Sequence, residues 1–393
     1  MDSLKTNYIS FFVVYFTISL INTFITLYIP IFMLVILDVN RIELAFIQFL
    51  SYITLFLGPI TGLFFDKFPY KKRKLILISS VLLFFSFSFF NLNLNNLSYF
   101  GIFLALNFTT SLIIKAGMSK LMLETSKQKD RKKNIILISN VSASFGSILP
   151  IILFNVLIYD IDSIWLWSLF FNLCWIMSSP ILITFFLIKD ELLIVDSKIK
   201  NVVILPQEHY KKRSINSGLL LTFLTNFLIW GDKLLEFPFS SWILTKFGES
   251  GFFIYSYLFF IFNYLYIAGW FISRRLKNQH KSKIYLSISI FIYGLLMFFL
   301  IFSDLITFLL ITATNKIVTG LMMSQLTERN VDISKLSKNT ALSYEMIRSS
   351  SLLASFIFVP LGTLLSFLIP VENLIIIVVF MSLSSITPIF LYT

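Results

Sequence analysis

The chain has 393 residues, of which 57% are apolar and 13% are charged, about half of the ~25% charged share in soluble proteins. A soluble domain of this composition would expose apolar surface over most of its area, so a soluble enzyme or binding module is excluded and a protein with several membrane spans is indicated. The net charge of +12 does not indicate nucleic-acid binding, because the basic residues are confined to short connections between apolar runs.

Six apolar segments of helical length occupy the first half of the chain. The first is too long for the apolar part of a cleaved signal peptide and has no small-residue cleavage pattern, so it is predicted to be a membrane helix. About 20 apolar residues are needed to cross the hydrocarbon core. We predict spans at 8–37, 45–65, 75–91, 99–121, 135–159 and 164–188.

The longest polar stretch, 189–215, divides the chain into halves at 1–188 and 216–393. Six further spans are predicted after it, at 216–238, 251–272, 284–302, 305–326, 341–369 and 373–391. The predicted fold class is therefore an all-α membrane protein of twelve transmembrane helices in two six-helix bundles.

A weak internal repeat relates the two halves. Residues 19–67 align with 227–274, so that Pro30 falls on Pro238 and Gly62 on Gly269. Two six-helix halves related by an axis along the membrane normal are a recurrent plan of transporters, and the repeat predicts pseudo-symmetric bundles.

The distribution of basic residues predicts the orientation. With the N-terminus inside, 26 of the 32 Lys and Arg residues fall in inner connections, whereas outer connections hold Arg41, Lys233 and Lys246. Lys and Arg collect on the cytoplasmic side of membrane proteins. Both termini and the 189–215 loop are therefore predicted to be cytoplasmic, with the basic loops against anionic lipid headgroups.

The connection between the second and third spans carries a motif, G-L-F-F-D-K-F-P-Y-K-K-R-K from residue 62 to 74. It resembles the hairpin G-x-L-A-D-R-x-G-R-K of the major facilitator superfamily: Gly62, Asp66, Lys67 and Lys71 match, while Pro69 and Tyr70 depart from the pattern. The resemblance implies a secondary transporter that works by alternating access.

The resemblance also implies a gate on the inner side. In the family, the acid of the motif, here Asp66, docks near the N-terminus of the eleventh helix, where a carboxylate is favoured. Glu345 and Arg348 near that end are further candidates for the gate. Their i,i+3 spacing is equally typical of an intrahelical pair that lowers the cost of insertion.

Charged residues within spans are costly and each needs a reason. Lys316 lies near the middle of the tenth span and is a candidate anchor for a substrate anion, or a partner of an acid on a neighbouring helix. Lys115 on the fourth span is a second cation, which can also snorkel to the inner surface. Asn22 and Asn107 are candidate substrate-binding groups, although Asn also joins helices to one another.

Asp232 and Glu236 lie on the seventh span at i,i+4 spacing, which in an α-helix places both carboxylates on one face. A buried carboxyl can bind a proton near neutral pH, so the pair is predicted to couple transport to protons. The alternative places both acids at the level of the outer headgroups, with Lys233 neutralising one of them.

The sequence thus predicts a transporter of the cell membrane, a symporter that moves a small anionic or zwitterionic solute on a proton or solute gradient. A lipid- or lysophospholipid-handling protein and a transport-inactive sensor on the same scaffold are the alternatives. Neither a nucleotide-binding P-loop nor a metalloprotease H-E-x-x-H motif is present, and the chain has one Cys and two His, so no enzyme activity, metal or cofactor is expected. The expected partners are the solute and membrane lipids, without nucleic acid, and the expected state is a monomer.

Overall fold

The structure is a computed structural model that describes residues 2–39, 57–68, 71–92, 97–125, 129–158, 160, 162–184, 212–236, 238–276, 282–366 and 368–391. Helices make up most of these ranges, which include no β-strand. This is expected of a chain in hydrocarbon, where a helix satisfies its backbone N–H and C=O groups without water.

The chain divides into two compact units. The first unit is Met1–His209 together with Asn339–Leu342, and the second is Tyr210–Lys338 together with Ser343–Thr393. The predicted central loop at 189–215 lies almost wholly outside the described residues. The division into domains at 188 and 216 therefore stays a prediction.

The helices of the first unit follow most of the first six predicted spans. The second predicted span, 45–65, is described only from residue 57 onward. The elements are α1 (Asp2–Thr23), the π-helix η1 (Phe24–Tyr28), α2 (Ile29–Val35), α4 (Gly58–Lys67), α5 (Lys72–Leu92), α6 (Leu97–Thr125), α7 (Lys129–Leu157), α8 (Ile164–Ser178) and the 3-10 helix η4 (Ser179–Ile183).

The second unit contains the remaining helices, except that the first residues of α15 group with the first unit. Its elements are α11 (Lys212–Ile229), the 3-10 helix η6 (Trp230–Leu235), α12 (Pro238–Arg275), α13 (Ser282–Leu300), α14 (Leu305–Lys335), α15 (Thr340–Leu365), α16 (Val371–Ser384) and α17 (Ile386–Leu391).

Seven helices in the described part of the chain are long and apolar enough to cross a membrane. They include Phe100–Glu124 and Leu305–Lys335, which match the predicted fourth and tenth spans. The protein is therefore an integral membrane protein, as its composition predicts. The count of twelve spans stays a prediction.

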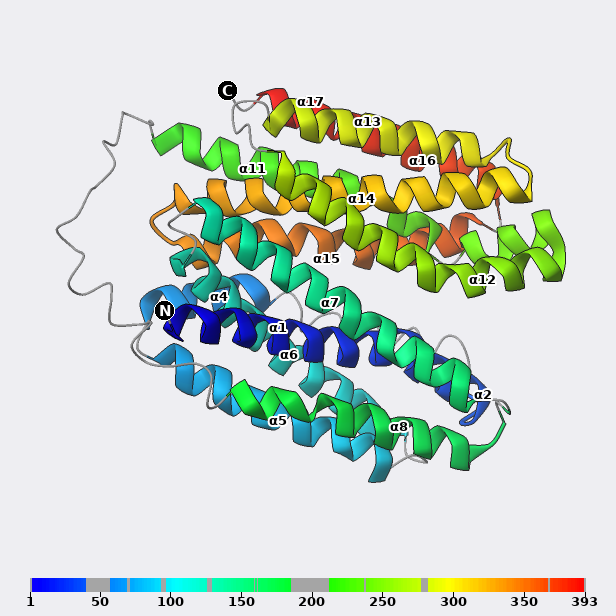
Figure 1. Ribbon diagram of the computed structural model, residues 1–393, viewed down its shortest axis with the longest axis horizontal. Helices are drawn as coiled ribbons and strands as arrows, with labels where there is room; N and C mark the ends of the chain where they lie inside the picture. Colours follow the sequence, from blue (N-terminus) through cyan, green and yellow to red (C-terminus); the bar gives the residue numbers. More distant parts are fainter. Residues whose placement is uncertain are drawn as a thin grey trace. The chain divides into compact units, whose positions relative to one another are not determined.

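Glycines allow helix backbones to touch within each unit. In the second unit, α12 and α14 run side by side (Figure 1), and the Cα of Gly269 faces the carbonyl of Ile317 while Gly320 faces that of Tyr266. In the first unit, α1 and α7 approach in the same way where Gly146 meets the carbonyl of Phe16. Small residues drive such packing in membranes, because burial against lipid-like side chains gives no hydrophobic gain.

The seventh helix is longer than predicted. The predicted span ends at residue 238, but a helix runs from Pro238 to Phe247 and the chain turns only at Gly248, where φ is 70°. Glycine adopts this backbone conformation without the strain that a side chain would add. Asp232 consequently lies much farther from the turn than the predicted boundary implies.

The end of this helix is fixed within the second unit. The Lys246 ammonium donates to the carbonyls of Leu300 (3.0 Å) and Ile301 (2.7 Å) at the end of α13, and the Trp242 indole donates to Glu372 at 2.7 Å. Burial lowers the pKa of Lys246, and the Glu372 carboxylate acts in the opposite direction. These bonds satisfy carbonyls that a helix end leaves without intrahelical partners.

We expect Gly320→Ala to destabilise the protein by about 1–3 kcal/mol, because the new methyl group would collide with the Tyr266 carbonyl and force α12 and α14 apart. Thermal unfolding in detergent measures the effect. Gly101→Ala on α6 is the matched control, since a Cβ there meets nothing within 4 Å and Ala favours a helix. Equal melting temperatures for the two variants would contradict the close crossing.

Candidate functional site

Asp66 forms the most elaborate polar contact of the first unit. Its Oδ1 accepts from the Lys120 ammonium at 2.6 Å and from the backbone N–H of Ala341 at 3.3 Å, and its Oδ2 accepts from the N–H of Leu342 at 3.0 Å. Lys120 also donates to the Thr340 hydroxyl at 3.0 Å. We call this group the Asp66 clamp: Asp66, Lys120 and the residues Thr340–Leu342 at the start of α15.

The clamp satisfies backbone N–H groups at the N-terminus of α15. The first N–H groups of a helix have no intrahelical partner and carry partial positive charge, so a carboxylate there is favoured. Gly62, one turn before Asp66, allows the close approach, because a Cβ at Gly62 would lie 2.8 Å from the Ala341 carbonyl oxygen. This is the contact that the resemblance to the family implies for Asp66.

A second ion pair supports the clamp. Lys72, which is 3% exposed, forms a very close ion pair with Glu124, and Glu124 lies 3.9 Å from the Lys120 ammonium. Acids and bases therefore alternate from Lys72 through Glu124 and Lys120 to Asp66. Within this group of four residues each charge has an opposite charge beside it, which a buried network requires.

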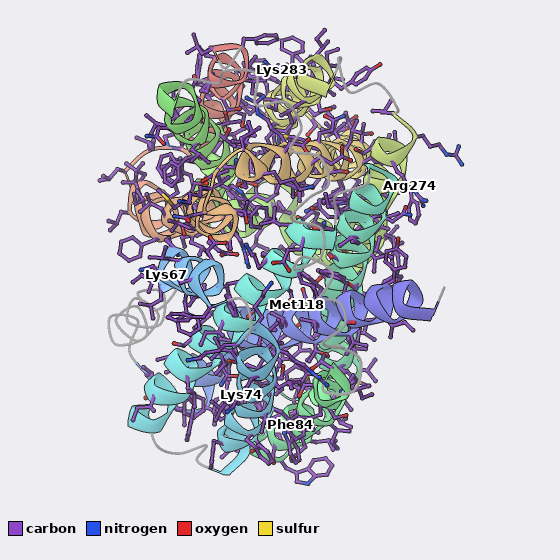
Figure 2. The ribbon with its side chains drawn as sticks, turned by 90° about the vertical axis from the view of Figure 1, so that its left-hand side faces the viewer. Lys67, Lys74, Phe84, Met118, Arg274 and Lys283 are labelled. Carbon is purple, nitrogen blue, oxygen red and sulfur yellow. The ribbon has the colours of Figure 1, made fainter. Side chains whose placement is uncertain are left out.

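The basic residues of the motif differ in their exposure to solvent. Lys67 is exposed at the end of α4, and Figure 2 labels it together with Lys74 near the start of α5. Lys71, predicted as a gate residue, is exposed with its ammonium 5.2 Å from the Phe68 ring centroid, whereas Lys72 is buried. A role of Lys67 or Lys71 in the gate stays a prediction.

Sequence reasoning missed Lys72 and Lys120 as parts of this site. In the sequence Lys72 is one of several basic residues after the second predicted span, and Lys120 lies at the end of the predicted span 99–121. One signal was available: Glu124 follows Lys120 by four residues, a spacing that places the two side chains on one helix face.

Glu345 and Arg348 lie within the second unit. Glu345 is buried at 2% exposure, and the Arg348 Nη1 lies 3.5 Å from its Oε1. This is the i,i+3 pair that their spacing predicts. A role for either residue in the gate stays a prediction.

Asp232 and Glu236 are not on one face, contrary to expectation. Trp230–Leu235 form a 3-10 helix, in which residues four apart point in directions about 120° apart. Glu236 is exposed and pairs with Lys233 at 2.7 Å, while the Oδ1 of Asp232 is buried and makes no hydrogen bond to a described residue. Lys233 thus neutralises the exposed acid of the two.

The Asp232 carboxylate acts electrostatically on Lys316 on α14 and on the buried Tyr293 on α13. Lys316 lies about 17 Å along the helix from Leu305, near the middle of a ~30 Å hydrocarbon layer. The neighbouring Asn315 is buried, and its Oδ1 has no hydrogen-bond partner among the described residues. A cation, an acid and an amide oxygen are therefore held in the interior of the second unit.

In the first unit, Lys115 is half-buried on α6, which continues to Thr125. Lys115 is therefore about 15 Å from the helix end and deeper than the predicted span implies, which makes snorkelling less favourable. Asn107 is fully buried: its Nδ2 donates to the Phe103 carbonyl at 2.8 Å, and its Oδ1 has no partner among the described residues. Asn22 is half-buried on α1.

No protein-family model and no curated protein matches the sequence. Two solved structures match nearly the whole chain at 13% identity each. The human organic anion transporter MFSD10 (TETRAN) has a TM-score of 0.67, over 99% of this chain and 98% of that chain. The transporter FucP of the major facilitator superfamily, in its outward conformation, has a TM-score of 0.70, over 100% of this chain and 99% of that chain.

The chain has the fold of major facilitator superfamily transporters. The thirteen-residue motif at 62–74 therefore indicated the correct fold, although the sequence as a whole has diverged far from both proteins. Within this fold, the described His, Cys, Asp and Glu residues form no group of three that could hold a metal ion.

We expect Asp66→Asn to speed hydrogen exchange at Ala341 and Leu342 roughly ten- to hundredfold, because losing a charge-assisted hydrogen bond costs about 1.5–3 kcal/mol. Exchange followed by mass spectrometry on peptides covering 336–345 measures this. Asp162→Asn is the control, since Asp162 is exposed and its side chain is remote in sequence from α15. Unchanged protection in Asp66→Asn would show that the carboxylate does not hold these amides.

Proposed function

We propose that this protein is a secondary transporter that moves a small anionic or zwitterionic solute across the membrane by alternating access, coupled to protons. The fold is the general support, because both matching structures are transporters. The observation that carries the proposal is the Asp66 clamp. It fastens the first turn of α15 through polar bonds that can break and form again, rather than through apolar packing.

The clamp is suited to a gate for an energetic reason. Each hydrogen bond to a charged group contributes about 1.5–3 kcal/mol, so a few of them set an equilibrium that a ligand can reverse. Releasing Asp66 does not leave it without a countercharge, because Lys120 remains beside it, and Lys72 and Glu124 neutralise one another behind it. Gly62, Asp66, Lys120 and Lys72 are thus the gate residues that the geometry supports.

Lys316 and Lys115 support an anionic group on the solute. Each is a cation deep in a helix of a different unit, and such a residue in a membrane protein indicates a substrate or ion pathway. The matched human protein is named an organic anion transporter. Asn107 and Asn22 are proposed to contribute polar contacts in the first unit, with the Asn107 Oδ1 able to accept a hydrogen bond from a solute amine.

Asp232 supports proton coupling. Its Oδ1 is shielded from solvent and accepts no hydrogen bond from a described residue, and Lys316 is within electrostatic range. Protonating Asp232 removes its attraction for Lys316, and an arriving solute anion competes for the same ammonium. Proton binding and anion binding therefore favour the same change, which is the physical basis of symport.

Uptake into proteoliposomes tests the proposal. We expect purified protein to accumulate radiolabelled solutes from a panel of small carboxylates, phosphates and amino acids, and to do so faster when the outside is more acidic. Liposomes containing the Asp66→Asn variant are expected to take up solute more slowly at unchanged protein content. Movement of labelled lysophospholipid without solute uptake would favour a lipid-handling protein, and movement of neither would favour a sensor.

We expect Lys316→Met to weaken binding of the transported anion at least tenfold, because Met keeps the length of the side chain and removes its charge. Tryptophan-fluorescence or calorimetric titration of detergent-solubilised protein measures the affinity. Lys338→Met is the matched control, since Lys338 is exposed just beyond α14. An affinity that is the same in both variants would make Lys316 a structural partner of Asp232.

We expect Asp232→Asn to abolish the pH dependence of uptake, because an amide cannot carry the proton, while Glu236→Gln keeps the dependence. The structure separates the two acids, with Glu236 exposed and paired to Lys233. Initial uptake rates across a series of pH values measure the effect. Loss of pH dependence only in Glu236→Gln would assign proton coupling to the exposed carboxylate instead.

A further inference from the structure

Eight buried side-chain polar atoms of the second unit make no hydrogen bond to a described residue, and three of them are the Asp232 Oδ1, the Gln325 Nε2 and the Ser382 Oγ. These three belong to three different elements, η6, α14 and α16. Ser382 is 1% exposed, so lipid and bulk water do not reach its hydroxyl. Each such group costs about 1–3 kcal/mol if it stays unsatisfied.

Contacts of neighbouring residues bring the segments around Asp232 and Ser382 together in one layer of the unit. A Cβ at Gly231, next to Asp232, would lie 2.9 Å from Met381, next to Ser382. A Cβ at Gly294 would lie 3.3 Å from Leu383, on the other side of Ser382. The α16 segment around Ser382 is thus flanked by η6 and by α13.

The same layer includes Tyr293 and Gln325. Tyr293 precedes Gly294 on α13 and interacts electrostatically with Asp232. One turn earlier on α13, the Ser289 hydroxyl lies 3.5 Å from the Gln325 Oε1. The Ser289 hydroxyl donates more closely to the Tyr285 carbonyl, at 2.8 Å, and the Gln325 Nε2 makes no hydrogen bond to a described residue.

Water fits this set of groups better than a metal cation does. The layer offers an acceptor in the Asp232 carboxylate, a donor in the Gln325 amide and a hydroxyl that can do both in Ser382. Buried waters make about three hydrogen bonds to polar groups of this kind. A cation requires oxygen ligands, and the Gln325 Nε2 is a hydrogen-bond donor that cannot coordinate a cation.

We propose that Asp232, Gln325 and Ser382 bind an internal water molecule that delivers protons to Asp232. This inference rests on the proposed role of Asp232 in proton coupling. A proton that reaches the water forms a third O–H bond on it. The water then releases one proton to the Asp232 carboxylate, so that one O–H bond of the water breaks, the O–H bond of the carboxyl forms, and no electron is transferred. Gln325 and Ser382 are positioning residues that hold the water, and Tyr293 is the neighbouring hydroxyl.

The charged groups that face Asp232 come from two elements. Lys233 and Glu236 follow it in its own segment, Lys316 approaches from α14, and Tyr293 is the titratable group on α13. From α16, the described neighbours Met381 and Ser382 are uncharged. The water is therefore the mobile donor of the layer, while Lys316 sets its electrostatic environment.

Infrared difference spectroscopy between acidic and neutral pH tests the inference on full-length protein in lipid. We expect a carboxyl band that disappears in Asp232→Asn and a water band that shifts when H₂¹⁸O replaces water. Gln325→Met and Ser382→Ala are expected to keep the carboxyl band and to lose the shifted water band. Ser385→Ala is the matched control, because Ser385 is equally buried but its hydroxyl already donates to the Ser382 carbonyl at 2.6 Å.

The outcomes separate the two proposals. A carboxyl band without any ¹⁸O-sensitive water band, or a water band that persists in both Gln325→Met and Ser382→Ala, overturns the water site and leaves proton binding by Asp232 intact. Lack of an Asp232 carboxyl band overturns proton coupling itself. A carboxyl band that responds to sodium at constant pH would replace the water with a bound cation. Thermal unfolding of each variant checks that folding is preserved.

Discussion

The backbone hydrogen bond in a medium without water is the constraint on which this structure depends. It makes each span a helix, and it makes every helix end and every irregular turn a place where polar groups must be satisfied by other means. The Asp66 carboxylate meets this need at the start of α15, and the Lys246 ammonium meets it at the end of α13. At both sites a charged side chain lies at the helix terminus that carries the opposite partial charge.

Irregular turns occur at corresponding places in the two units. The π-helix Phe24–Tyr28 precedes Pro30, and the 3-10 helix Trp230–Leu235 precedes Pro238, the proline that the internal repeat aligns with Pro30. Proline removes one backbone donor and disturbs the turn before it, which accounts for both departures from α geometry. In the second unit the departure turns Asp232 away from the exposed side of Glu236.

The charges of the protein thus serve two different purposes. The Asp66 clamp and the Lys72–Glu124 pair behind it are closely paired, so they stabilise one arrangement and can be exchanged for another at moderate cost. Asp232 lies in electrostatic range of Lys316, but its Oδ1 has no direct partner among the described residues, and on this difference rests our proposal that Asp232 binds the coupling proton. The proposed transporter uses both kinds of site, one that holds a state and one that senses the ligand.

Composition and hydrophobic runs by themselves determined the membrane class and the positions of most helices, because hydropathy and charge act along the chain. The contact of Asp66 with the start of α15 was implied only by the resemblance of the hairpin motif to the family. Tertiary structure decided what spacing could not: that Lys72 rather than Lys71 is buried, that Lys120 completes the clamp, that the seventh helix turns at Gly248, and that Asp232 is separated from Glu236. Each of these depends on where a helix begins, ends or changes its winding, and packing between helices sets those boundaries.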